Sequence, residues 1–169
     1  MRKKADFLLH SITTYHSFCK INYMKNLFSG NKAFNAIGQL EFLPLLLIRI
    51  TLAYGFYGPA VMKWKDIDGI AEWFSSLGIP AAHLNAYLAA GTEALGVVLL
   101  VLGLGVRFIS IPLIITMIVA ITTVHWSNGF DAGDNGFEIP LYYIVMLITL
   151  LIFGSGKAGL DYWLKRRNK

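Results

Sequence analysis

The stretch "GTEALGVVLLVLGLG", residues 91–105, decides the fold because it is apolar almost throughout yet carries a carboxylate, Glu93, near its start. It lies in one of four apolar runs, each close to the ~20 residues that cross the hydrocarbon core of a bilayer as a helix. The runs cover residues 42–62, 84–104, 108–126 and 139–156. No strand-like alternation competes with them. We therefore predict an all-α fold, a four-helix transmembrane bundle over residues 41–156.

The composition supports a membrane protein. The chain has 169 residues, is 56% apolar and has a mean hydropathy of +0.56, which is more apolar surface than a soluble domain of this length can bury. Cys19 is the only cysteine, which excludes an internal disulfide and a CxxC redox pair. Any redox chemistry would need a bound cofactor, a quinone or a partner protein.

The distribution of positive charge predicts the topology. Of the 15 Lys and Arg residues, six precede the first run, five follow the last, and Arg107 lies in the turn between the second and third runs. Only Lys63 and Lys65 lie in the loops on the opposite side. The positive-inside rule then places both termini in the cytoplasm. The basic ends suit anionic membrane lipid better than nucleic acid.

Both terminal segments are basic, and we expect residues 1–40 and 157–169 to lie in the cytoplasm. Residues 1–23 contain neither a span nor a signal-peptide pattern, and Met24 opens a stretch that looks like a natural start. Two interpretations stay open: residues 1–23 are a cytoplasmic extension, or translation starts at Met24. Under either interpretation we expect residues 1–23 to be dispensable.

The loops on the less basic side have distinct characters. Apolar residues recur at helical spacing after Lys65, with acidic residues off that stripe, which predicts a short amphipathic helix on the outer surface between spans one and two. The loop at 127–138 is rich in Gly, Asn and Asp, faces outward and is acidic. This acidic outer loop is a candidate surface for a protein partner.

Glu93 needs a partner, because an ionised side chain inside a bilayer costs several kcal/mol unless it is paired or hydrated. Arg49 in the first run is the expected partner, since at ~1.5 Å per residue the two differ in depth by roughly 6 Å. Such a pair is either a structural clamp or the polar floor of a cavity that opens outward. Arg49 also belongs to a stripe at helical spacing that puts Lys63 on the same face: Arg49, Ala53, Phe56, Ala60, Lys63.

Three further polar residues lie near the outer end. His125 ends the third run, Glu138 begins the fourth, and Tyr142 follows one turn later, where it lines either a cavity or the bundle core. Histidine and carboxylates can bind metal ions, but these are scattered and share no ligand spacing. We therefore predict no metal site, and we expect His125 to be a hydrogen-bonded interface residue.

Three motifs resemble the DoxX family of small four-span bacterial membrane proteins. They are "RITLAYGFYGPAVMKW", "EALGVVLLVLGLGVR" and "GSGKAGLD", in that order along the chain. Ser155 stands where the family has proline and Gly159 where it has serine, so the third motif is only partly met. "TTVHWSNGF" and "NGFEIPLYY" also resemble a branch linked to copper-binding peptide maturation. The matching motif residues are Gly96, Gly103, Arg107, Gly154, Gly156 and Asp161.

The resemblance implies a membrane role without a fixed reaction, since relatives include a thiosulfate–quinone oxidoreductase subunit and members of oxidative-stress complexes, and many have no established activity. The first hypothesis is an accessory subunit of a membrane redox or metal/peptide-maturation system. The alternative is a quinone-reactive subunit in which Arg49 and Glu93 contact the quinone. A small transporter is the third hypothesis, which the absence of an inverted repeat disfavours. Neither a substrate nor an oligomeric state follows from the sequence.

Overall fold

The computed structural model describes Leu40 and residues 42–167, and the regular elements in this part of the chain are all helical. The predictions for residues 1–23 lie outside the described residues. Six α-helices follow one another along the described part: α3 Leu43–Lys65, α4 Ile67–Ser76, α5 Ala82–Leu102, α6 Val106–Ala120, α7 Glu138–Phe153 and α8 Leu160–Arg167.

The third span extends beyond α6. A π-helical turn, Ile121–His125, and a 3-10 turn, Trp126–Asn128, continue the same apolar helix, so that Val106–Asn128 is 23 residues long. Threonine hydroxyls bond to backbone carbonyls where the helix widens: Thr122 donates to Ile118 O at 3.0 Å and Thr123 donates to Val119 O at 2.7 Å.

Three helical segments among the described residues are long and apolar enough to cross a membrane, and α7 is a shorter apolar helix of 16 residues. The fourth run was predicted to reach residue 156, but α7 ends at Phe153 because Gly154 adopts φ +81°, a left-handed conformation that favours glycine. The predicted helical membrane bundle is confirmed, and the protein is an integral membrane protein of this type.

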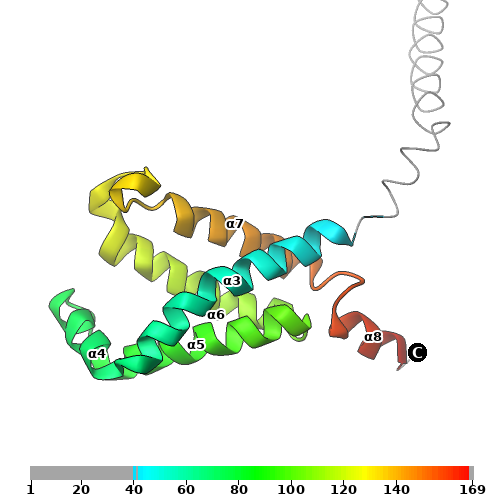
Figure 1. Cartoon of the computed structure of the whole chain (residues 1–169), viewed down its shortest axis with the longest axis horizontal. Helices are drawn as coiled ribbons and strands as arrows, with labels where there is room; N and C mark the ends of the chain where they lie inside the picture. The colour runs from blue at the N-terminus through cyan, green and yellow to red at the C-terminus, as the bar shows by residue number, and fades with distance from the viewer. Residues whose placement is uncertain (1–39, 41, 168–169) are drawn as a thin grey trace, which may run out of the picture. The chain divides into compact units, whose positions relative to one another are not determined.

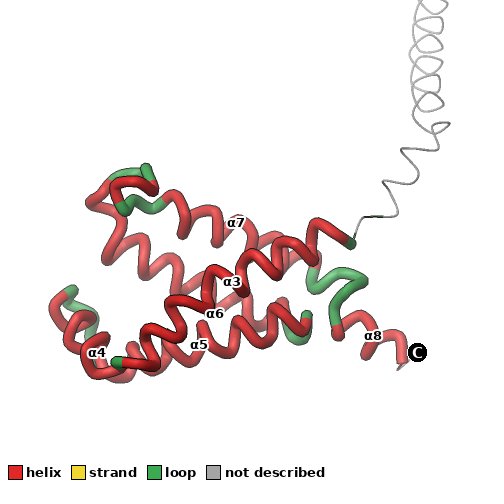
Figure 2. The backbone as a smooth tube through the Cα atoms, viewed as in Figure 1, coloured by secondary structure: helices red, strands yellow, loops and turns green. Residues whose placement is uncertain are grey.

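The helices form a bundle with two distinct ends, named here the α4 end and the α8 end (Figures 1 and 2). Helix α3 begins at the α8 end and runs to the α4 end, and α5 returns beside it as its main packing partner. Helices α6 and α7 form the second antiparallel pair. Toward the α4 end, α3 and α4 lie apart from the α6–α7 hairpin in Figure 1.

Small residues let α3 and α5 approach closely. Ala53 and Ala60 on α3, and Ala86 and Ala90 on α5, are all buried. Small side chains at helix interfaces are the usual basis of packing in membranes, where the surrounding lipid is as apolar as the protein. The predicted stripe from Arg49 along α3 is therefore confirmed as the buried face of that helix.

A glycine fixes the contact between α3 and α7. A Cβ built on Gly55 would meet the hydroxyl end of the Tyr143 ring, so the ring can lie against α3 only because residue 55 has no side chain. The Tyr143 ring also meets Phe56 edge-on, with ring centroids 5.4 Å apart. The neighbouring Gly58 has open space around its Cβ position and plays no such part.

The predicted amphipathic helix between the first two spans is confirmed as α4. Its first turn is capped by Asp66, whose carboxylate accepts from Gly69 N at 3.0 Å. Ala71 is buried, while Trp73 is among the exposed large apolar side chains. Helix α4 packs on α5 and follows directly on α3.

Candidate functional site

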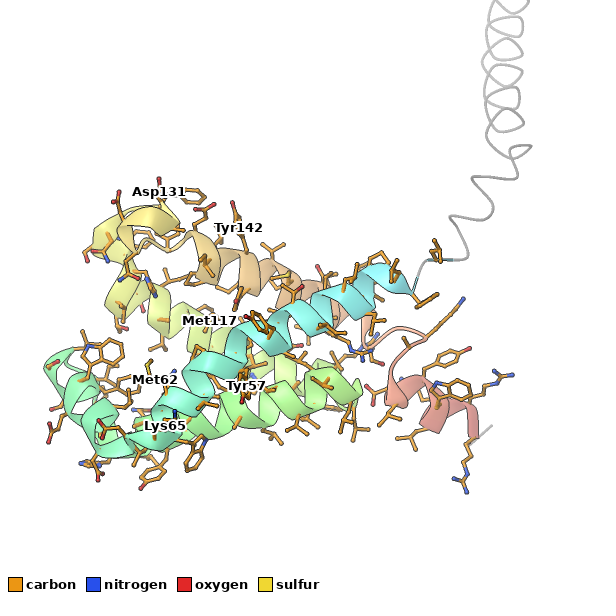
Figure 3. The ribbon with its side chains drawn as sticks, viewed as in Figure 1. Tyr57, Met62, Lys65, Met117, Asp131 and Tyr142 are labelled. Carbon is orange, nitrogen blue, oxygen red and sulfur yellow. The ribbon has the colours of Figure 1, made fainter. Side chains whose placement is uncertain are left out.

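A cavity of about 950 Å³ opens at the α4 end of the bundle, between α3, α4, α5, α6 and α7. Its walls are mostly apolar and include Met62 on α3 and Met117 on α6, both labelled in Figure 3. Trp73 and Phe74 of α4 also line it. Ligand sites of this kind combine apolar walls with a few convergent polar groups.

The main polar feature of the cavity is an ion pair between Lys63 of α3 and Glu93 of α5. Lys63 Nζ donates to both carboxylate oxygens of Glu93, at 3.0 Å and 2.8 Å. Both residues line the cavity, and their side chains are only 12% and 3% exposed. Glu93, which was predicted to need a buried partner, therefore has one in Lys63. The ion pair forms part of the cavity wall.

Helix geometry explains why these two residues meet. The Cα–Cβ bond of every helical residue tilts toward the N-terminus of its own helix. Helices α3 and α5 are antiparallel, so Lys63 leans toward the α8 end while Glu93 leans toward the α4 end. The two long side chains converge across the small-residue interface that holds the helices together.

The predicted Arg49–Glu93 pair is wrong. By the same geometry, Arg49 leans toward the α8 end and Glu93 toward the α4 end, so the two side chains diverge. All three guanidinium nitrogens of Arg49 bond elsewhere: Nε donates to Leu100 O at 2.9 Å, Nη1 to Ser155 O at 2.8 Å and Nη2 to Val101 O at 3.1 Å. The backbone depth estimate ignored the direction of the side chains.

Arg49 instead closes the α8 end of the bundle. Leu100 and Val101 lie in the last turn of α5, where helix carbonyls have no partner within the helix. A buried cation there satisfies those carbonyls and opposes the negative end of the helix dipole. Arg49 is 1% exposed and does not line the cavity, and its hydrogen bonds join the last turn of α5 to the connection after α7.

Further polar groups line the cavity besides the ion pair. Tyr143 and Thr116 contribute from α7 and α6, and His125 contributes from the π-helical turn. His125 Nδ1 lies 2.8 Å from Asn135 O, which makes it the hydrogen-bonded residue that we expected.

The other two outer candidates bind each other and do not line the cavity. Tyr142 donates from its hydroxyl to Glu138 Oε1 at 2.8 Å, and Glu138 Oε2 accepts from Ala132 N at 3.1 Å. In the nearby loop Asp131 Oδ1 accepts from Gly133 N at 2.8 Å. Figure 3 shows Asp131 and Tyr142 on the α6–α7 side of the molecule. Among the described residues, no three or more His, Cys, Asp or Glu side chains gather as metal ligands.

The motif residues of the family have structural positions that the sequence could not show. Asp161 at the start of α8 accepts from Gly105 N at 2.9 Å and Val106 N at 3.4 Å, which caps α6. Gly103 has φ +67°, and a Cβ there would meet Gly159 and the Arg49 guanidinium. Gly96 similarly leaves room for Leu113 of α6.

The remaining motif positions lie at the same end. Gly154 and Gly156 both have positive φ and form the connection between α7 and α8. Arg107 donates to Ile152 O at 2.8 Å from the first turn of α6. These residues, with Arg49, build the α8 end, while Lys63 and Glu93 define the cavity at the α4 end.

Comparison with known proteins gives a family match and similar chains in several bacteria. The DoxX family model matches residues 44–126, which include Arg49, Lys63 and Glu93. An uncharacterized protein of Haemophilus influenzae is 33% identical over 126 residues, covering 72% of this chain and 83% of that protein. A Bacillus subtilis protein named "Putative oxidoreductase CatD" is 31% identical over 118 residues, covering 69% of this chain and 83% of its own length.

A third relative also supports the membrane assignment. An uncharacterized membrane protein of Mycobacterium tuberculosis is 30% identical over 134 residues, covering 73% of this chain and 82% of that protein. The search of solved structures found no match. The motifs, the helical membrane bundle and these relatives together show that the chain belongs to the DoxX family.

Proposed function

We propose that this protein is the ligand-binding membrane subunit of a redox system and that its cavity binds a quinone. The observation that carries the proposal is the Lys63–Glu93 ion pair in the wall of an apolar cavity of about 950 Å³. The name of the Bacillus relative, which describes that protein as an oxidoreductase, points in the same direction.

The chemistry of the wall suits a quinone head group. A quinone ring is apolar on its faces and carries carbonyl oxygens at its edges, so it needs apolar walls and a hydrogen-bond donor. The Lys63 ammonium has three N–H groups and is held in place by Glu93, so it can donate to a quinone oxygen. The carboxylate of Glu93 can accept or return a proton as the quinone and quinol forms exchange.

The membrane setting suits the ligand as well. Apolar ligands reach a bundle through the lipid, and the walls supplied by Met62, Met117 and Phe74 would contact the tail or ring. Electrons would come from a partner protein, for which the acidic outer loop at 127–138 is the proposed contact surface. We place the chain in a bacterial inner membrane with both termini in the cytoplasm, on the strength of the charge asymmetry along the sequence.

A cavity-filling variant tests the proposal without touching the ion pair. Ala89 lines the cavity, so Ala89→Trp should fill it, whereas Leu95→Trp on the same helix places an equal ring on the exposed face. A short-chain quinone analogue is titrated into detergent-purified protein, with quenching of tryptophan fluorescence as the readout. We expect saturable binding by the wild type and Leu95→Trp and at least a ten-fold weaker affinity for Ala89→Trp. Equal affinities in all three proteins would rule out the cavity as the binding site.

A further inference from the structure

A second groove lies at the opposite end of the bundle, next to α8, and it shares no lining residue with the α4-end cavity. It has a volume of about 310 Å³ and is formed by the first turn of α6, the last residues of α7, the following connection and α8. It is therefore independent of the proposed quinone site.

The groove carries a surplus of positive charge. Arg107, Lys157 and Lys165 line it together with one carboxylate, Asp161. That carboxylate already accepts from Gly105 N at 2.9 Å and Val106 N at 3.4 Å, so its charge is directed into the start of α6. Arg107 and Lys165 by themselves outnumber this carboxylate, so the groove suits an anion.

Arg107 is held in a position to bind a phosphate. Its Nη2 donates to Ile152 O at 2.8 Å, which uses one of the five guanidinium N–H groups. Gly154 has no side chain at the point where a Cβ would lie 3.3 Å from Arg107 Nε, so the guanidinium can lie along the backbone of the connection. A guanidinium fixed in this way suits bidentate contact with phosphate oxygens.

The apolar neighbours of the groove favour a lipid as the source of an anionic group. Phe108 on α6 is 82% exposed and Phe153 on α7 is 66% exposed, and both line the groove. On membrane helices these exposed rings face the acyl chains of the lipid. Trp163 on α8 is also exposed beside basic residues, a composition typical of a helix at the membrane interface.

We propose that this groove binds the phosphate head group of an anionic phospholipid, with the acyl chains lying against Phe108 and Phe153. Basic pockets beside membrane helices bind such head groups, and each basic residue near an anionic membrane surface contributes about a five-fold factor in affinity. A soluble phosphate would gain nothing from the two exposed phenylalanines.

The test measures lipid binding to the full chain purified in a neutral detergent, by native mass spectrometry and by thermal stabilisation. The probes are phosphatidylglycerol, phosphatidylcholine with the same acyl chains, and inorganic phosphate. We expect phosphatidylglycerol to bind at least ten-fold more tightly than either of the other two. Equal binding of the two lipids, or equal binding of inorganic phosphate, would overturn the proposal.

Matched charge variants locate the site. Arg107→Gln/Lys165→Gln removes two groove charges, and Arg166→Gln/Arg167→Gln removes two charges from α8 that do not line the groove. We expect the groove variant to lose about ten-fold or more in phosphatidylglycerol affinity, because its side chains would bond the phosphate directly, and the control to lose much less. Equal losses would mean general surface attraction and would refute the site. If the double variant does not fold, the single variants Lys165→Gln and Arg166→Gln are compared. We expect Lys165→Gln to bind phosphatidylglycerol about five-fold more weakly than Arg166→Gln. Equal affinities of these two variants would also refute the groove as the site.

Discussion

The direction in which each side chain leaves its helix decides how the buried charges pair. Lys63 and Glu93 lean toward each other across two antiparallel helices, whereas Arg49 leans away from Glu93, toward the carbonyls of Leu100 and Ser155. Counting residues along the two spans gave the depth of each charge but not the direction of its side chain. The need of Glu93 for a buried cation was predictable from the sequence, whereas the identity of that cation was not.

A double-mutant cycle tests this pairing. Lys63→Met or Glu93→Met alone leaves one buried charge without its partner, which typically costs about 3–5 kcal/mol in soluble proteins and less in membranes. The double variant should lose less stability than the sum of the two, with a coupling energy of about 0.5–3 kcal/mol. Unfolding in detergent gives the free energy of unfolding of the wild type, the two single variants and the double variant.

The cycle of Arg49→Met with Glu93→Met is the control. Because these two residues share no hydrogen-bond partner in the structure, their effects should add to within about 0.5 kcal/mol. The opposite result would be additivity for Lys63 and Glu93 together with coupling for Arg49 and Glu93. It would mean that Glu93 pairs with Arg49 and not with Lys63.

At the scale of elements, close approach between helices depends on a few small residues. The apolar runs and their lengths predicted the spans and α4, because hydropathy and helical spacing are local properties of the sequence. The cavity was less predictable, since its walls come from five helices and its shape depends on how far α3 diverges from the α6–α7 hairpin. The roles of Gly55 and Gly103 likewise depend on residues distant in sequence.

Two glycines on α3 provide a matched test of this packing. Replacing an exposed helical glycine with alanine stabilises a helix by about 1 kcal/mol, so Gly58→Ala should be neutral or stabilising. Gly55→Ala should destabilise by about 1–3 kcal/mol, because its Cβ meets the Tyr143 ring. Thermal unfolding in detergent gives both values. Tyr143→Leu should restore much of the loss in Gly55→Ala, and failure to do so would show that the ring is not the obstacle.

At the scale of the whole molecule, the two ends of the bundle carry different features. The α8 end is closed by Arg49 and by the Asp161 cap, and it carries the basic groove. The α4 end is open and carries the ion pair. The positive-inside rule predicts that the α8 end faces the cytoplasm, so the cavity would open toward the outside.

Reporter fusions test this orientation. A reporter enzyme that is active only outside the cytoplasm should give no signal when fused after Lys169 and a strong signal when inserted at Gly133 in the outer loop. The expected pattern follows from the twelve basic residues on one side and two on the other. The reverse pattern of signals would mean that the protein is inserted in the opposite orientation, with the cavity on the cytoplasmic side.

The central claim is that the Lys63–Glu93 pair recognises a quinone in the α4-end cavity, and one titration tests it most directly. A short-chain quinone analogue is titrated into wild type, Lys63→Met/Glu93→Met and Lys65→Met, where Lys65 is an exposed lysine near the same end of α3. We expect wild type and Lys65→Met to bind saturably with equal affinity and the folded double variant to bind at least ten-fold more weakly. Absence of saturable binding in the wild type, or full affinity in a folded double variant, would contradict the account.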